Sequence, residues 1–410
     1  MHSTLFTLAL FWAVVCAIPF RRRLLSRADE SSEIPRLVIY YQTTHDSSGR
    51  PISVLPLITE QQIALTHLIV AAFHVHANGT IHLNDYPPEQ PLFDTLWNET
   101  RILQAAGVKV LGMVGGAAPG SFTAATLDAD ADAITTATTT PGNRTSTATS
   151  PTAAFEAAYA LLHNAITTHK LDGIDLDVEQ AMSQAGITRL VRRLRADFGA
   201  EFVITLAPVA SALQGRGAPG RNLSGFSYAA LEREAGDAIA FYNTQFYSSF
   251  GDLAAPADFE RIVAAGWDPR RVVLGQLTSP VHGTGFVPHA RLAEVVAGLR
   301  KRYGEIGGIM GWEYFNGVPG GAREPWRWAQ AMTAILRPGG ALKLRITREM
   351  AEGLNRTWVS SAMAAAAAVG GGGDVEEDDG GGARRRPTPG TPERRVRLTP
   401  NVDYMAMVNA

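Results

Sequence analysis

Eight short apolar runs of strand-forming residues, each followed by a helical stretch, constrain the fold of this chain more than any other feature. The runs fall at residues 36–41, 67–73, 108–114, 173–178, 201–207, 238–247, 271–277 and 307–312. Between them lie amphipathic stretches, among them 155–170, 187–199 and 290–304. Strands that alternate with helices form helix-covered parallel sheets, and eight such units predict one (β/α)8 TIM barrel. A doubly wound open sheet is the alternative, because periodicity does not show whether a sheet closes.

The barrel is expected to occupy residues 34–340, a usual length for this fold. Within it, residues 117–153 are rich in Ala and Thr and predict a long loop on the C-terminal rim of the barrel. A short C-terminal extension follows at 341–359. Residues 360–410 combine acidic and basic blocks with Gly and Pro, which is typical of a disordered tail.

The N-terminus indicates a secretory signal peptide at 1–17, because its apolar run is too short to span a membrane and ends in small residues. The polar, basic segment at 18–33 is expected to be a linker or pro-segment. The only cysteine, Cys16, lies inside the signal, so no disulfide is expected in the mature chain. Five Asn-x-Ser/Thr sequons agree with secretion and predict a glycoprotein. They begin at Asn78, Asn98, Asn143, Asn222 and Asn355.

Composition and motifs exclude several classes of function. The formal net charge of −2 disfavours a nucleic-acid partner. The ten histidines show no metal-ligand spacing, and the Gly-rich stretch at 370–382 lacks the lysine of a phosphate-binding loop. We therefore expect no metal and no cofactor. Beyond the leader no apolar stretch is long enough for a membrane span, and we expect a monomer.

The stretch LDGIDLDVEQ at 171–180 places acids on a predicted strand. Side chains alternate along a strand, so Asp175, Asp177 and Glu179 share one face and their apolar neighbours the other. Because the outer face of a barrel strand packs on helices, these acids must point into the barrel. Crowded carboxylates raise one another's pKa and share protons, and a carboxyl that stays protonated can serve as a general acid. A solvent-exposed strand face is the alternative explanation, but three acids in strict alternation favour a chemical role.

This stretch, Asp172-Gly-Ile-Asp175-Leu-Asp177-Val-Glu179, resembles the DGxDxDxE signature of glycoside hydrolase family 18, the chitinases and related endo-β-N-acetylglucosaminidases. The resemblance extends over the whole predicted barrel. It implies that Glu179 protonates the glycosidic oxygen while the 2-acetamido carbonyl of the substrate itself attacks the sugar, with retention. It also implies that Asp177 orients the acetamido group and that Asp175 shares a proton with Asp177. Asp172 is out of phase with these acids and is expected, with Gly173, to support the motif structurally.

The resemblance assigns residues at other strand ends as well. It implies that Tyr247 binds the acetamido carbonyl, with Gln245 on the same face, and that Trp312 forms the apolar floor under the reacting sugar. Tyr41 or its neighbour Tyr40, Phe73 and Gln276 are further candidates for lining the pocket. The structural motif after the third strand includes Gly115 and Gly116. The chain departs from the usual family residues at Met113, Leu206 and Ser248.

The function predicted from these residues is secreted, endo-acting hydrolysis of β-1,4 bonds after N-acetylglucosamine in chitin or chitooligosaccharides. Only about thirty residues separate the runs at 271–277 and 307–312, too few for the extra α+β lobe that deepens the cleft of some relatives. An open groove favours endo cleavage. An endo-β-N-acetylglucosaminidase acting on the core of N-glycans is the alternative. A non-catalytic chitin-binding lectin is disfavoured, because such relatives usually lose the acid at the position of Glu179.

Overall fold

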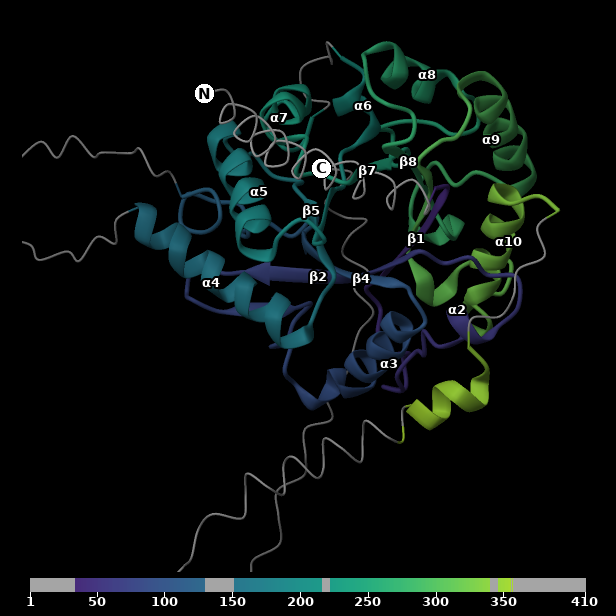
Figure 1. Cartoon of the computed structure of the whole chain (residues 1–410), viewed down its shortest axis with the longest axis horizontal. Coiled ribbons are helices and arrows are strands. Elements are labelled where there is room, and N and C mark those ends of the chain that lie inside the picture. Colours follow the sequence, from purple (N-terminus) through teal and green to yellow (C-terminus); the bar gives the residue numbers. More distant parts are fainter. Residues whose placement is uncertain (1–33, 130–150, 216–221, 340–345, 355, 357–410) are drawn as a thin grey trace, which may run out of the picture.

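The computed structural model describes residues 34–129, 151–215, 222–339, 346–354 and 356. Within these residues a closed barrel of parallel strands is surrounded by helices (Figure 1). The predicted leader at 1–17, pro-segment at 18–33 and tail at 360–410 lie outside the described residues. So do residues 130–150 of the predicted rim loop, and sequons Asn143 and Asn355.

Eight strands form the barrel, and each falls within or overlaps one of the eight apolar runs. They are β1 (Arg36–Tyr41), β2 (His67–Val75), β4 (Lys109–Gly115), β5 (Gly173–Asp177), β6 (Val203–Leu206), β7 (Phe241–Gln245), β8 (Val272–Leu277) and β9 (Gly308–Trp312). Neighbouring strands pair in parallel, and β1 pairs with both β9 and β2. The sheet therefore closes, which confirms the predicted barrel and excludes the open doubly wound sheet.

A ninth strand, β3 (Ile81–Leu83), pairs antiparallel with the end of β2 and was not predicted. It is only three residues long, too short for a clear periodic signal in the sequence. Residues 278–307 between β8 and β9 contain only a 3-10 turn, η2 (Pro280–His282), and one helix, α9 (His289–Tyr303). The extra α+β lobe is therefore absent from this fully described segment, as the sequence predicted.

The remaining helices and 3-10 turns connect the strands or, in the case of η3, η4 and α10, follow the last strand. They are α2 (Pro56–Thr59), η1 (Pro91–Phe93), α3 (Asp94–Ala105), α4 (Pro151–His169), α5 (Gln184–Phe198), α6 (Ala210–Leu213), α7 (Tyr228–Ala235), α8 (Ala257–Ala264), η3 (Tyr314–Asn316), η4 (Gly321–Arg323) and α10 (Trp326–Leu336). Ser183 and Ser227 are the N-cap residues of α5 and α7, and the side chain of each accepts a hydrogen bond from a backbone N–H of the first turn. No helix among the described residues combines the length and apolarity needed to cross a membrane.

The strands separate two apolar layers. The outer layer lies between the strands and the helices and includes Ile174 and Leu176 of β5. The inner layer fills the barrel with residues such as Val38, Met113 and Phe241. Because side chains alternate along β5, its acids face the inner side, toward the C-terminal mouth of the barrel. Residues 346–354 also pack on the barrel through Ile346 and Ala351, which belong to the outer layer.

Candidate active site

Asp175 lies fully buried inside the barrel and is held by neutral donors from three other strands. The Tyr40 hydroxyl of β1 donates to its Oδ2 (2.7 Å). The Thr205 hydroxyl of β6 and the Asn243 side-chain amide of β7 donate to its Oδ1 (2.5 and 3.0 Å). These three hydrogen bonds fix the carboxyl group at the centre of the barrel.

Asp177 and Glu179 are joined by the side-chain amide of Gln245 on β7. Its Nε2 lies 3.1 Å from Oδ1 of Asp177 and 3.1 Å from Oε1 of Glu179. The same nitrogen also donates to the backbone carbonyl of Ala207 (3.0 Å). Asp177 is buried, whereas Glu179 is half-buried at the mouth of the barrel. The acid nearest solvent is therefore the one expected to meet a leaving group.

The environment of the three acids raises their pKa values. Burial, followed by the charges of Glu179 and Asp175, holds the pKa of Asp177 well above its usual range. Burial raises the pKa of Glu179, opposed by the hydrogen bond from Gln245. Burial likewise raises the pKa of Asp175, opposed by its three donors. No ion pair in the described part of the chain includes these acids, so protons rather than cations must reduce their mutual repulsion.

Gly115 and Gly116 allow β4 to approach the acids closely. Both have positive φ angles (+101° and +86°), and the Gly116 N–H donates to the backbone carbonyl of Asp177 (2.8 Å). A Cβ on Gly115 would lie 2.3 Å from that carbonyl oxygen. Gly173 has the same role toward β6, because a Cβ there would lie 2.2 Å from the carbonyl oxygen of Val203. These positions therefore require glycine.

Asp172 points away from the other acids. Its Oδ2 accepts hydrogen bonds from the backbone N–H of Val110 and from the side chain of Gln104 on α3 (2.8 Å each). It thereby fastens the start of β5 to β4 and α3. This geometry supports the structural role that the sequence predicted for Asp172.

Tyr247 and Trp312 lie beside Tyr40. The rings of Trp312 and Tyr40 are 5.5 Å apart and inclined by 59°, and Trp312 is partly exposed at the end of β9. Tyr247 is buried two residues beyond Gln245. Burial raises the pKa of Tyr40 most strongly, the charges of Asp175 and Asp177 raise it further, and Tyr247 adds to this effect. The structure thus brings Glu179, Asp177, Asp175, Gln245, Tyr247 and Trp312 together.

Tyr41 and Gln276 do not line this site, contrary to prediction. The Tyr41 hydroxyl donates to the carbonyl of Ile52 (2.5 Å), and its ring belongs to the outer apolar layer. The Gln276 side chain contacts the sulfur of Met332 on α10 (3.2 Å). Both follow the strand alternation, because Val38 of β1 and Val273 of β8 face inward and fix the opposite phase for these two residues. The inward tyrosine of β1 is Tyr40.

Phe73 also faces outward, and here simple alternation fails. The pairing of β2 with β4 shifts between Val70 and Phe73, where three residues of β2 span two of β4. This bulge turns Ala72 into the barrel and Phe73 into the outer layer, where it stacks on Trp97 of α3 at 6.4 Å. Nothing in the local sequence marked the extra residue.

Two site residues were missed in the sequence, Thr205 and Asn243, although a signal for both was present. Thr205 is a polar residue inside the apolar run at 201–207, and Asn243 is two residues before Gln245. Period-two alternation therefore places both inside the barrel. A polar side chain that faces a barrel interior is informative, because it needs a partner there.

The three departures from the usual family residues lie differently around the site. Met113 packs in the inner layer, beside Gly116. Leu206 faces the outer layer. Ser248 directly follows Tyr247 with a φ of +54°, and its N–H donates to the carbonyl of Thr284 (2.9 Å). None of the three takes part in the hydrogen bonds that hold the acids. Among the described residues, no group of three or more His, Cys, Asp or Glu side chains has the geometry to hold a metal ion.

Comparison with known proteins agrees with this geometry. The family model of glycosyl hydrolases family 18 matches residues 36–267, more than half of the chain. This chain belongs to glycosyl hydrolase family 18. The resemblance of the acidic strand to that family is thereby confirmed.

Among solved structures of family 18, a fungal endo-β-N-acetylglucosaminidase is 56% identical, with a TM-score of 0.67, over 75% of this chain and 100% of that protein. The chitinase ChiC from Aspergillus fumigatus is 44% identical, with a TM-score of 0.60, over 73% of this chain and 98% of that protein. Among curated proteins, Chitinase 2 of Rhizopus oligosporus is 27% identical over 151 residues. That match covers 35% of this chain and only 25% of the relative's length.

Proposed function

We propose that this protein hydrolyses β-1,4 bonds between N-acetylglucosamine residues, with chitin and chitooligosaccharides as substrates. The observation that carries the proposal is the column of Asp175, Asp177 and Glu179 with raised pKa values inside a family 18 barrel. The described segment between β8 and β9 contains no additional lobe, which supports an open groove and endo cleavage.

The arrangement supports catalysis by the substrate's own acetamido group. Glu179 donates its proton to the glycosidic oxygen while the bond from that oxygen to C1 breaks, and the acetamido carbonyl oxygen attacks C1. Asp177 accepts a hydrogen bond from the acetamido N–H and stabilises the positive charge of the oxazolinium ring. Glu179, now a carboxylate, removes a proton from water as that water adds to C1, and the β-configuration is retained. Tyr247 donates to the acetamido carbonyl, and Trp312 packs under the sugar ring.

Hydrolysis of the chitobiose core of N-glycans is a second candidate function. The bond is again a β-1,4 link between two N-acetylglucosamine residues, so the same acids serve both substrates. One observation favours it: the 56% identical solved structure is named an endo-β-N-acetylglucosaminidase, whereas the named chitinase is 44% identical.

The deciding experiment digests N-acetylchitohexaose and a high-mannose glycoprotein side by side, with Glu179→Gln as the inactive control. A chitinase releases short chitooligosaccharides, whereas the second candidate leaves a single N-acetylglucosamine on the protein. The proposal fails if the wild-type protein cleaves neither substrate, and binding of chitin without cleavage points to a lectin.

We also propose that the protein is secreted, on the basis of the predicted signal peptide at 1–17. Mass spectrometry of culture-medium protein should find these residues removed. An intact N-terminus on protein retained inside the producing cell contradicts this proposal.

A further inference from the structure

A turn at Asn222–Phe226 lies against the chain segment that carries Glu179. The Ser224 hydroxyl donates to the backbone carbonyl of Val178 (2.6 Å), and the backbone carbonyl of Ser224 accepts from the N–H of Met182 (2.9 Å). Val178 immediately precedes Glu179, and Met182 follows it by three residues. One residue outside the barrel therefore holds the backbone on both sides of the proposed acid.

The turn is itself fixed before it contacts this segment. The Asn222 side chain accepts from the N–H of Ser224 (3.0 Å) and donates to the carbonyl of Phe226 (2.6 Å). The hydroxyls of Ser224 and Tyr228, at the start of α7, are 2.8 Å apart. Because the Ser224 hydroxyl donates to Val178, it accepts from Tyr228. Ser224 and Tyr228 are 3% and 1% exposed, so water does not compete for these bonds.

The turn approaches the Glu179 segment closely, and its backbone conformation favours glycine. Gly225 has a φ of +77°, and a Cβ there would lie 3.1 Å from the Cα of Ala181. On its other side the same segment is fastened by the Gly120 N–H, which donates to the side chain of Gln180 (2.7 Å). The backbone next to Glu179 is thus braced from two directions.

We infer that Ser224, supported by Tyr228, is a positioning residue that sets the location of the Glu179 carboxyl for proton donation, an inference that rests on the proposed function. The Glu179 side chain has one hydrogen-bond partner among the described residues, Gln245. Its position relative to a glycosidic oxygen therefore follows the backbone at Val178–Met182. A displacement of about 1 Å at a reacting group can lower a rate roughly a hundredfold.

The test compares Ser224→Ala with Thr66→Val. Thr66 is a matched control, because its buried hydroxyl also bonds the backbone of a strand. It accepts from the N–H of Leu37 (3.0 Å) and donates to the Leu37 carbonyl (2.9 Å). Thr66 lies just before β2, at the other end of the barrel from Glu179. Each variant is assayed on a chitooligosaccharide and on an aryl chitobioside, whose leaving group needs little protonation. We expect Ser224→Ala to lose roughly tenfold or more in kcat on the oligosaccharide, several-fold less on the aryl substrate, and little in KM. Thr66→Val should keep the wild-type ratio of the two rates.

Tyr228→Phe provides a second variant in case Ser224→Ala does not fold. It keeps the ring and removes the hydroxyl, so we expect the same substrate pattern with a smaller loss. The inference is overturned if either folded variant loses equal activity on both substrates or keeps wild-type kcat. An inactive wild-type enzyme would instead refute the proposed function.

Discussion

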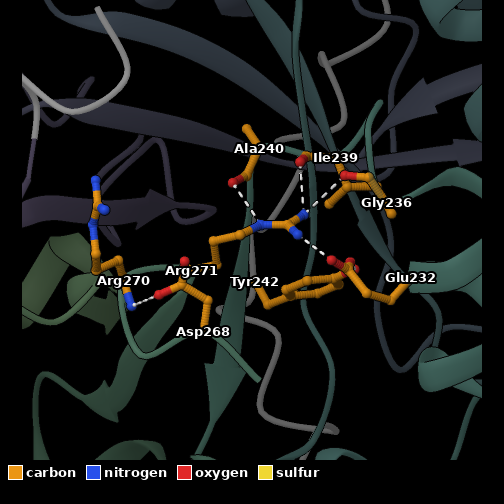
Figure 2. A network of polar contacts seen from close by, with 8 residues as sticks. All are labelled: Glu232, Gly236, Ile239, Ala240, Tyr242, Asp268, Arg270 and Arg271. Atoms are coloured by element: carbon orange, nitrogen blue, oxygen red, sulfur yellow. Dashed lines mark hydrogen bonds and ion pairs between the residues drawn. The ribbon is translucent and has the colours of Figure 1, made fainter. Parts of the chain in front are cut away.

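The carboxylate of Glu232 and the acids of β5 lie near opposite ends of one barrel and are stabilised in opposite ways. Glu232 accepts from the Arg271 guanidinium and from the Tyr242 hydroxyl (Figure 2). Arg271 directly precedes β8 and also donates to three backbone carbonyls in the connection from α7 to β7. These are Gly236 (3.1 Å), Ile239 (2.8 Å) and Ala240 (3.4 Å).

The acids at the C-terminal end have no such cation. Asp175, Asp177 and Glu179 accept hydrogen bonds from neutral hydroxyls and amides, and their pKa values are raised. A carboxylate paired with Arg is stabilised in its charged form, whereas crowded carboxylates with neutral partners retain protons. Under the proposed mechanism, one barrel thus keeps an ion pair at its N-terminal end and the catalytic acids, without a cationic partner, at its C-terminal end.

The largest expected effect comes from replacing the acids at the C-terminal end of the barrel. We expect Glu179→Gln to lower kcat on chitooligosaccharides roughly a hundredfold or more, with partial recovery on an aryl chitobioside. Asp177→Asn should show no such recovery, because orienting the acetamido group is needed whatever group leaves. Steady-state kinetics on both substrates measure this difference.

Product stereochemistry provides the control for this prediction. The first product detected by NMR should be the β-anomer, and a thiazoline mimic of the cyclic intermediate should inhibit the wild-type enzyme. An initial α-anomer, or full activity on substrates without the N-acetyl group, would rule out participation of the substrate.

Replacing Arg271 at the N-terminal end of the barrel should affect stability instead of catalysis. Arg271→Met removes the cation from a partly buried carboxylate and leaves three carbonyls without this donor. We expect the free energy of unfolding to fall by about 2 kcal/mol, less than for a fully buried pair. Urea denaturation measures the change, and kcat of the folded variant should stay within about twofold of wild type. A large loss of kcat at full stability would show that the two ends are coupled.

The strands of this barrel could be predicted from sequence because each is an apolar run bounded by polar residues. The column of acids could also be predicted, since alternation along one strand needs no knowledge of other strands. The residues of other elements that contact each acid could not be predicted. Glu232 and Arg271 are 39 residues apart in the chain, and only the pairing of β7 with β8 brings them together.

The residues that were wrongly predicted to line the pocket show the same limit of reasoning from single strands. The outward directions of Tyr41 and Gln276 follow from regular alternation once one inward residue of each strand, Val38 or Val273, is known. Phe73 could not, because the bulge in β2 that reverses its direction depends on pairing with β4. Single strands thus predict which side chains share a face, and pairing decides which face is inside.

A smaller effect should appear in the pH dependence of stability. The pKa of Asp177 is raised in the folded protein, so its ionisation destabilises the fold as pH rises above the ordinary pKa of Asp near 4. Asp177→Asn removes this penalty. We expect the variant to gain on the order of 1 kcal/mol relative to wild type between pH 4 and pH 7. Thermal unfolding across this range measures the gain, and parallel curves for both proteins would contradict the raised pKa.

An effect of similar size is expected from Tyr242→Phe at the N-terminal end of the barrel, beside Glu232 and Arg271. The ring should stay in place, because it packs edge-on against Trp267 at 4.9 Å and lies 5.5 Å from the Arg271 guanidinium. Loss of the hydroxyl removes one hydrogen bond to Glu232, which retains Arg271, so we expect about 1 kcal/mol of destabilisation. Burial and the neighbouring Glu232 hold the pKa of Tyr242 well above its usual range, so the hydroxyl remains a donor between pH 5 and pH 8. The loss measured by urea denaturation should therefore be the same at both pH values, unlike the pH-dependent gain of Asp177→Asn. A loss that changes with pH would contradict this expectation, and the contrast between the two ends of the barrel would fail.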